Sequence, residues 1–492
     1  MPPPLALLAL TACGAPEITL PAGGDRPDVI LISIDTLRAD HVGAYGYDRP
    51  TTPTLDALAA RGARFTQARS PSPWTLPTHT TLLTGRLPLE HGVVDDGARL
   101  AEGTPTLQAA LGAAGWITGG VVSSLFVSAR YGFDRGFTFF EDFGIHDEKQ
   151  NLKGEVIAEE LVTTSLNFVA QHPNQPVFLF LHLYDVHYPY TAPSPYDTMF
   201  DRAPEKGDAR YKSYAHSLKR PISDAQMAHQ IAQYDEELRY VDDQLGRLFA
   251  AFAAAGRSPI IAVTADHGEE LGERGGWGHA HTLHPEQLHV PWILAGPGVP
   301  VTVVNTPVGT HDIASTLAAL VGVPFESSGT NALAPNLPER PMIADTSRFD
   351  TNLLGLALGG LRLDWDLTTN TQRLYLDAAE RQEAAASRPD DVARLMSALT
   401  AQLGAPVELT SGSLRSPAAL IGAEGRLPQP VQSPARFAVV PPDAPLRHDP
   451  AGALRLSALP EGAPVRVTGP TASEVRLSDE ERRRLEALGY VQ

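Results

Sequence analysis

The sequence predicts an α/β protein in which a mostly parallel sheet is sandwiched by helices. Three continuous apolar runs, rich in β-branched residues, have the length and composition of buried parallel strands, and they span residues 28–34, 177–183 and 259–265. Helix-like and strand-like segments alternate before residue 130, which is typical of βα units. From about Arg340 the pattern changes to short strands separated by turns, so a small C-terminal part follows the main domain.

The remaining elements are expected from caps, breakers and apolar spacing. Helices are expected at residues 52–62, 105–115, 224–255, 310–321 and 389–403. Strands are expected at 116–122, 291–295, 353–361, 362–367 and 373–376. With 492 residues, 43% of them hydrophobic, the chain has enough apolar material for a large core.

The charge balance limits the class of partner. The formal net charge is −18 at pH 7, which argues against a nucleic-acid-binding protein. An anionic substrate would therefore have to be attracted locally, by a metal ion and a helix dipole.

The N-terminus carries the only cysteine of the chain, Cys13, so no intrachain disulfide can form. The run Leu5–Cys13 ends in Leu-Thr-Ala-Cys and resembles the lipobox of bacterial lipoproteins, and it is too short to span a bilayer. We therefore expect residues 1–27 to be a lipoprotein-type signal and tether, with a lipid anchor at Cys13 that places the protein at the bacterial cell envelope. Because Met1–Pro4 lacks a basic residue, a disordered apolar tail is the alternative.

Polar residues stand where the three apolar strands end. Asp35 follows the first, Asp185 and His187 follow the second, and the adjacent pair Asp266 and His267 follows the third. Ligands gather at the carboxyl ends of parallel strands. An adjacent Asp and His before a glycine can reach one cation from a tight turn, so a metal site is predicted at this edge.

Thr75 is predicted at the N-terminus of a short helix. Serines and prolines precede it, Pro77 occupies a favoured first-turn position, and Gly85 ends the apolar stretch. A helix N-terminus attracts anions, so the Thr75 hydroxyl would be well placed to attack an anionic centre. The alternative is that Thr75 only caps the helix.

Three stretches together resemble the signature of the sulfatase family. They are Thr75–His79, the Leu-Thr-Gly-Arg that ends at Arg86, and His91-Gly92. That family has a Cys or Ser, converted to formylglycine, where Thr75 stands, and an Arg where His79 stands. A threonine cannot be processed to formylglycine. The form Thr-x-Pro-x-His resembles nucleotide pyrophosphatase/phosphodiesterases, relatives within the alkaline phosphatase superfamily that use the threonine itself as nucleophile.

The resemblance implies a metal site made by Asp35, Thr75, Asp266 and His267. Many sulfatases have a second Asp in the position of Thr36, so one carboxylate ligand is missing or replaced. Oxygen ligands with one imidazole suit Ca²⁺, Mg²⁺ or Mn²⁺ if one ion is bound, whereas a site with two ions favours Zn²⁺. A divalent ion lowers the pKa of a bound hydroxyl, so Thr75 could attack as an alkoxide.

The resemblance also assigns residues to the substrate. His187 would contact the substrate or protonate the leaving oxygen, and His79 and His281 take the places of the family's anion-binding Arg and Lys. In a two-metal arrangement Asp185 and His281 would hold the second ion, although two-metal phosphodiesterases space the Asp and His more widely. The neighbouring histidines at 279, 284 and 289 are assigned to structure.

The resemblance covers residues 28–403. It implies a catalytic domain at residues 28–339 and a small antiparallel subdomain at 340–403 that completes the fold. Residues 404–492 form a Pro/Ala-rich extension outside the resemblance, and a short helix with Ser478 as its N-cap is expected at its end.

These observations predict a metal-dependent hydrolase of a monoanionic ester, with phosphodiesters slightly ahead of sulfate esters. The substrate would be a small anionic ester or a sulfated or phosphorylated glycan or lipid head group. One alternative is a transferase that moves a phosphoryl-linked head group to a cell-envelope acceptor. Another is a lipoprotein with a decayed site that only binds an anion, against which the intact Asp35, Asp266 and His267 argue.

Overall fold

The computed structural model describes most of the chain. The described residues are 18–144, 157–201, 223–349, 351–366, 369, 371–376 and 383–403, with five short strands between 424 and 474. The expected lipid anchor at Cys13 and the expected C-terminal helix lie outside this part. No helix in the described ranges has the length and apolarity that a membrane span requires.

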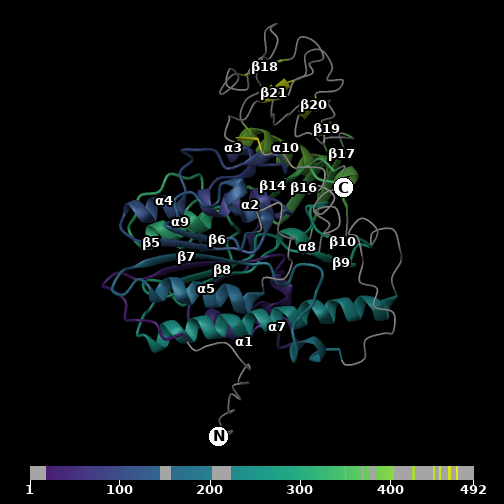
Figure 1. The fold of residues 1–492 in the computed structure, drawn as a ribbon. Helices are drawn as coiled ribbons and strands as arrows, with labels where there is room; N and C mark the ends of the chain where they lie inside the picture. Colours follow the sequence, from purple (N-terminus) through teal and green to yellow (C-terminus); the bar gives the residue numbers. More distant parts are fainter. Residues whose placement is uncertain are drawn as a thin grey trace.

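A sheet of eight strands forms the centre of the molecule (Figure 1). Its strands in spatial order are β12 (Thr302–Val304), β2 (Ala63–Phe65), β11 (Trp292–Ala295), β8 (Ile260–Thr264), β1 (Val29–Ile34), β7 (Val177–Leu183), β5 (Ile117–Val121) and β6 (Phe139–Glu141). Strand β11 runs antiparallel to both of its neighbours, and the other pairs are parallel. The prediction of a mostly parallel sheet is confirmed.

Helices cover both faces of this sheet (Figure 1). One face carries α1 (Pro53–Ala59), α5 (Ala158–Ala170) and α7 (Asp224–Ala254), and the other carries α2 (Thr75–Thr84), α4 (Leu107–Ala113) and α9 (Asp312–Leu320). All of these except α5 were expected from the sequence, with ends that differ by a few residues. Helix α2 begins at Thr75 and ends before Gly85, whose φ of 62° is the left-handed conformation typical of a helix C-cap.

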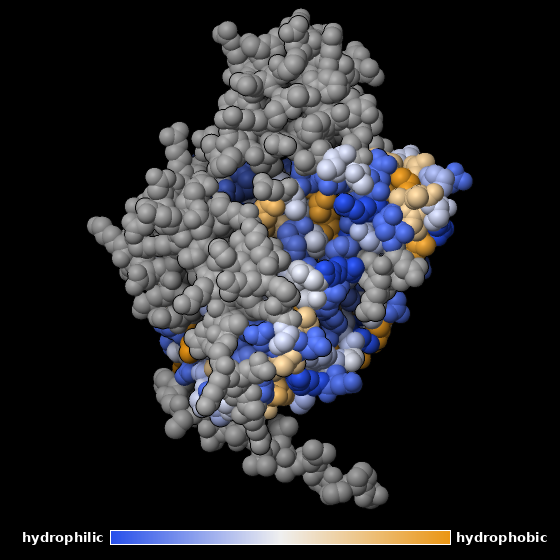
Figure 2. Space-filling model, turned by 90° about the vertical axis from the view of Figure 1, so that its right-hand side faces the viewer, coloured by the Kyte–Doolittle hydropathy of each residue, from blue (hydrophilic) through white to orange (hydrophobic). Residues whose placement is uncertain are grey.

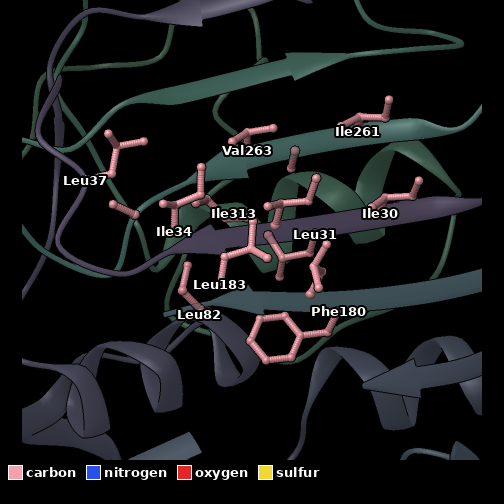
Figure 3. Close-up of a cluster of buried hydrophobic side chains, with 14 of the residues drawn as sticks. Ile30, Leu31, Ile34, Leu37, Leu82, Phe180, Leu183, Ile261, Val263 and Ile313 are labelled. Atoms are coloured by element: carbon pink, nitrogen blue, oxygen red, sulfur yellow. The ribbon is translucent and has the colours of Figure 1, made fainter. Parts of the chain in front are cut away.

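The three central strands are buried on both faces. All residues of β1, β7 and β8 are buried, which explains their continuous apolar sequences. Figure 3 shows apolar side chains of this core as sticks, among them Leu31 of β1, Phe180 of β7 and Leu82 of α2. The sheet and the helix that carries Thr75 therefore share one apolar core.

The predicted antiparallel subdomain is also present. It consists of β14 (Met342–Thr346), β15 (Leu353–Leu358), β16 (Leu361–Asp366) and β17 (Thr371–Tyr375), paired in that order, and of α10 (Pro389–Leu403). Within the extension, β22 (Ser473–Glu474) pairs antiparallel with β4 (Ala98–Arg99) of the main domain. The chain thus returns to the main domain after residue 404.

A buried ion pair ties together the starts of the three central strands. The Arg257 guanidinium donates to both carboxylate oxygens of Asp28, over 2.8 and 2.6 Å, and its side chain is fully buried. The same carboxylate accepts the N–H of Val177, and the Asp28 carbonyl accepts the N–H of Ile260. This pair therefore fixes the strands whose other ends carry the site.

Removing one partner of this pair should strongly destabilise the fold. Arg257→Ala leaves the Asp28 charge buried without its partner, so the free energy of unfolding should fall by about 3–5 kcal/mol in urea denaturation. Arg394→Ala is the matched control, because its pair with Asp391 is half exposed and should contribute about 0–1 kcal/mol. Equal losses in the two variants would contradict this role of Arg257.

Candidate active site

Three neighbouring strands deliver the predicted side chains to one edge of the sheet. Strand β1 lies between β7 and β8, and Ser33 is in register with both His182 and Thr264. Asp35 directly follows β1, and Asp266 lies two residues beyond β8. Because the strands are parallel and adjacent, their carboxyl ends meet, as the sequence predicted.

Asp35, Asp266 and His267 form one compact group. One ligand atom from each lies within 4.8 Å of the others, and all three residues are buried. The His267 Nε2 atom lies 3.3 Å from Asp266 Oδ2, 3.7 Å from Asp35 Oδ1 and 3.4 Å from the hydroxyl of Thr75. The four residues predicted to bind a cation are thus brought together.

The unsatisfied atoms of this group fit a cation. Both carboxylate oxygens of Asp35 and Oδ2 of Asp266 are buried and make no hydrogen bond in the described part of the chain. His267 donates from Nδ1 to the carbonyl of Gly268 over 2.9 Å, which leaves the lone pair of Nε2 facing the carboxylates. Buried charges need a partner, and a divalent ion would supply one.

The electrostatics of the group also favour a cation. Burial, then the charges of Asp266 and Glu269, raise the pKa of Asp35 well above its usual value. Burial also raises the pKa of Asp266, to about 6, and lowers the pKa of His267 to about 3, so the imidazole is neutral. Two neighbouring carboxylates and a neutral imidazole are suited to bind a positive ion.

His79 lies next to the group, with its Nδ1 3.5 Å from Oδ2 of Asp266. It is fully buried, donates from Nδ1 to the carbonyl of Thr75 over 2.8 Å, and accepts at Nε2 from the hydroxyl of Ser33 over 3.0 Å. Both ring nitrogens are used within the fold, so its placement does not support the expected substrate contact. His79 instead holds the first turn of α2 against β1.

His187 lies at the site, and so does a histidine that the sequence analysis had assigned to structure. His187 donates from Nδ1 to the carbonyl of Tyr188 over 2.6 Å. The ring of His279 lies 5.1 Å from that of His187 and 4.4 Å from that of His267, between centroids. His279 therefore lies between His187 and the metal-binding group. The one feature of the sequence that could have indicated this is that His279 stands two residues before His281, which was already a candidate for the site.

Asp185 and His281, the proposed second metal pair, each contact another group in the structure. Burial raises the pKa of Asp185 to about 7, and its carboxylate accepts the N–H of Ala158 at the start of α5. His281 faces Glu270, with Nε2 3.2 Å from Oε2. The described residues contain one group with metal-ligating geometry, and neither Asp185 nor His281 belongs to it.

A guanidinium from the small subdomain lies near Thr75. Arg348, in the loop after β14, stacks over the ring of the preceding residue, Trp74, with its central carbon 4.1 Å from the ring centroid. Its charge also lowers the pKa of His279, after larger effects of burial and of neighbouring histidines. Sequence reasoning missed Arg348, because nothing near it in the chain marks it as part of the site.

The polar rim of the molecule is the face that carries β9 (Glu270–Leu271) and β10 (Trp277–Gly278), which lie between His267 and His279 in the chain. Figure 2 looks onto the side on which Figure 1 shows α8 (Pro285–Leu288), β9 and β10. Hydrophilic residues predominate among the coloured side chains of this face.

A mostly parallel α/β sheet with a group that could hold a metal ion and a hydroxyl at its carboxyl edge is the arrangement that a metal-dependent hydrolase of anionic esters needs. A family model described as Sulfatase matches residues 27–323, which is more than half of the chain. The chain therefore belongs to the sulfatase family, and this membership supports hydrolysis of sulfate or phosphate esters.

Three comparisons illustrate the similarity. The chain is 25% identical over 369 residues to a delta 4,5-hexuronate-2-O-sulfatase of Bacteroides thetaiotaomicron, covering 67% of this chain and 75% of that protein. It is 23% identical over 354 residues to a choline-sulfatase of Rhizobium meliloti, covering 61% and 69%. A phosphonate monoester hydrolase of Silicibacter pomeroyi has the same fold, with a TM-score of 0.63, 21% identity and coverage of 75% and 94%.

Metal binding should stabilise the chain through Asp266. At a divalent-ion concentration of a hundred times Kd, the free energy of unfolding of the wild type should rise by about 2.7 kcal/mol, which a higher melting temperature would show. The free energy of unfolding of Asp266→Asn should rise little. Asp185→Asn is the control, because Asp185 is another buried acid with a raised pKa but lies outside the group. An equal response of the wild type and Asp266→Asn would contradict the assignment.

Without metal, stability should fall as the pH rises. The folded state raises the pKa of Asp266 from 3.8 to about 6, so the folded chain binds this proton more tightly than the unfolded chain does. The stabilisation is complete below about pH 4 and is lost as the pH passes about 6, by roughly 2–3 kcal/mol. The free energy of unfolding, measured by denaturation in chelator, should fall from about pH 4 to about pH 8 by this amount more in the wild type than in Asp266→Asn. The same change of unfolding free energy with pH in both proteins would contradict the prediction.

Proposed function

We propose that the protein hydrolyses monoanionic esters with Thr75 as nucleophile, and that it prefers phosphodiesters to sulfate esters. The observation that carries the proposal is the position of the Thr75 hydroxyl, at the N-terminus of α2 and 3.4 Å from Nε2 of His267. A divalent ion bound by Asp35, Asp266 and His267 would lower the pKa of that hydroxyl and offset the charge of the ester oxygens. With one metal-binding group described, Ca²⁺, Mg²⁺ or Mn²⁺ is the proposed ion.

The surrounding residues hold Thr75 ready for attack. Its carbonyl accepts hydrogen bonds from Nδ1 of His79 and from the hydroxyl of Thr78, over 2.8 and 2.9 Å. These bonds fix the first turn of the helix, whose free N–H groups favour an anion in front of them. The attacking oxygen therefore starts from a fixed position, which lowers the entropic part of the barrier.

The nucleophile itself favours phosphate. A formylglycine hydrate expels sulfate by returning to the aldehyde, but a sulfated threonine would have to be cleaved by water at sulfur. A phosphothreonine can be resolved by in-line attack of water on phosphorus. The positions of the family's anion-binding Arg and Lys hold His79 and His281, and both ring nitrogens of His79 bond within the fold. The site therefore offers less positive charge to an anion than a guanidinium and an ammonium would, which suits an ester with one negative charge better than an ester with two.

His187 is the proposed partner of the leaving oxygen. Burial lowers its pKa to about 3, so the ring is neutral near pH 7. The proton that it delivers would be taken up from water when an anionic ester lies against the ring and favours the imidazolium. His187 would then give a proton to the departing alcohol.

The substrate class is proposed from the relatives. Two related sulfatases are named for a hexuronate sulfate and for choline sulfate, and we propose a sulfated or phosphorylated glycan or lipid head group as the substrate. A lipid anchor at Cys13 would hold the enzyme at the bacterial cell envelope.

Replacing the nucleophile should abolish turnover without unfolding the chain. Thr75→Ala should lower kcat/KM for bis(p-nitrophenyl) phosphate by about 10³-fold or more, and Thr75→Ser should keep a measurable part. Thr84→Ala at the other end of α2 is the control, because its hydroxyl bonds the carbonyl of Thr80, one turn earlier in the helix. Full activity of Thr75→Ala, or faster cleavage of p-nitrophenyl sulfate than of the diester by the wild type, would contradict the proposal.

A further inference from the structure

Two strained residues lie together beside the candidate site. Thr36, next to Asp35, has a φ of 56°, and Val186, next to His187, has a φ of 88°. Both are β-branched, and such side chains rarely adopt the left-handed region, where glycine is usual. Strain of this kind persists only where the surrounding structure enforces it, and it is concentrated at functional sites.

Thr36 uses each of its polar groups to join a different element. Its hydroxyl donates to the carbonyl of Val186 over 2.7 Å, and its N–H donates to Oδ1 of Asp266 over 3.3 Å. Its carbonyl accepts the hydroxyl of Tyr234 on α7 over 3.0 Å. The side chain is fully buried, so these bonds have no competition from water.

Glu237 of α7 holds the same loop from the other side. Its Oε2 accepts the N–H of Val186 over 3.0 Å, and its Oε1 accepts the N–H of Thr191 over 2.8 Å. These two amides flank His187 in the chain. The carboxylate is buried, so the two bonds clamp the loop at both sides of the histidine.

We propose that Thr36 and Glu237 are positioning residues that hold His187 at a fixed place over the ester. The hydroxyl of Thr36 joins the turn that carries Asp35 to the loop that carries His187, and Glu237 fixes that loop to α7. Many sulfatases have an Asp in the position of Thr36. A carboxylate there could not donate a hydrogen bond to the Val186 carbonyl, as the Thr36 hydroxyl does. This inference rests on the proposed role of His187 as the acid for the leaving group.

Leaving-group dependence tests the inference. For aryl phosphodiesters whose phenols differ in acidity, Thr36→Val should lower kcat by about 10–100-fold for the least acidic phenol, because that leaving group needs a proton most. The loss should be below about 3-fold for the most acidic phenol, with KM nearly unchanged. Thr36→Ser, which keeps the hydroxyl, should restore most of the rate. An equal loss for all leaving groups would overturn the proposal.

Two controls separate positioning from general damage. Thr51→Val removes another buried hydroxyl, which donates to the carbonyl of His41 over 2.7 Å, and it should leave the leaving-group dependence unchanged. The losses in Thr36→Val and His187→Asn should not add in the double variant, because both remove the same proton transfer. Fully additive losses, or loss of bound metal from Thr36→Val by elemental analysis, would overturn the proposed role.

Hydrogen exchange tests the Glu237 clamp without any substrate. The amides of Val186 and Thr191 should be protected in the wild type and should exchange at least about tenfold faster in Glu237→Gln, since an amide cannot accept both N–H groups as a carboxylate does. Unchanged exchange in Glu237→Gln would overturn the clamp. The two proposals can fail separately. If the wild type cleaves neither the phosphodiester nor the sulfate ester, but Glu237→Gln still speeds the exchange of these amides, the proposed function is wrong and the role of Glu237 in holding the loop stands.

Discussion

The site depends on the repulsion between two buried carboxylates, those of Asp35 and Asp266. The register of β1 with β8 puts Asp35 beside Asp266, and neither side chain reaches water. Like charges in such a place cannot both ionise without a compensating cation, so the fold itself creates the demand for metal. The neutral imidazole of His267 suits the proposed cation, and the N-terminus of α2 suits the anion of the proposed ester.

Much of this arrangement could be predicted because it depends on strand ends. A buried parallel strand is recognisable from a continuous β-branched run, and the residue that follows it must lie at the carboxyl edge, so Asp35, Asp266 and His267 were found. Side-chain direction beyond the first turn depends on packing between distant segments. That is why Asp185 faces α5 and His281 faces Glu270, where no local pattern could have placed them.

The helix α5 and the guanidinium of Arg348 were missed for related reasons. Helix α5 follows residues outside the described part and carries neither a proline nor a side-chain N-cap at its start. Arg348 reaches Trp74 only because the small subdomain docks on the main domain, across a long separation in sequence. The site therefore combines local signals, which a sequence displays, with tertiary contacts, which it does not.

Every residue of α2 is buried, from Thr75 to Thr84. A helix enclosed on all sides cannot shift to suit ligands of different shape without disturbing the core. New substrate ranges would therefore arise by remodelling the polar rim and the subdomain loop at Arg348, while the reacting centre stays unaltered. Directed evolution of this enzyme would accordingly best begin with libraries in those loops and leave the helix intact.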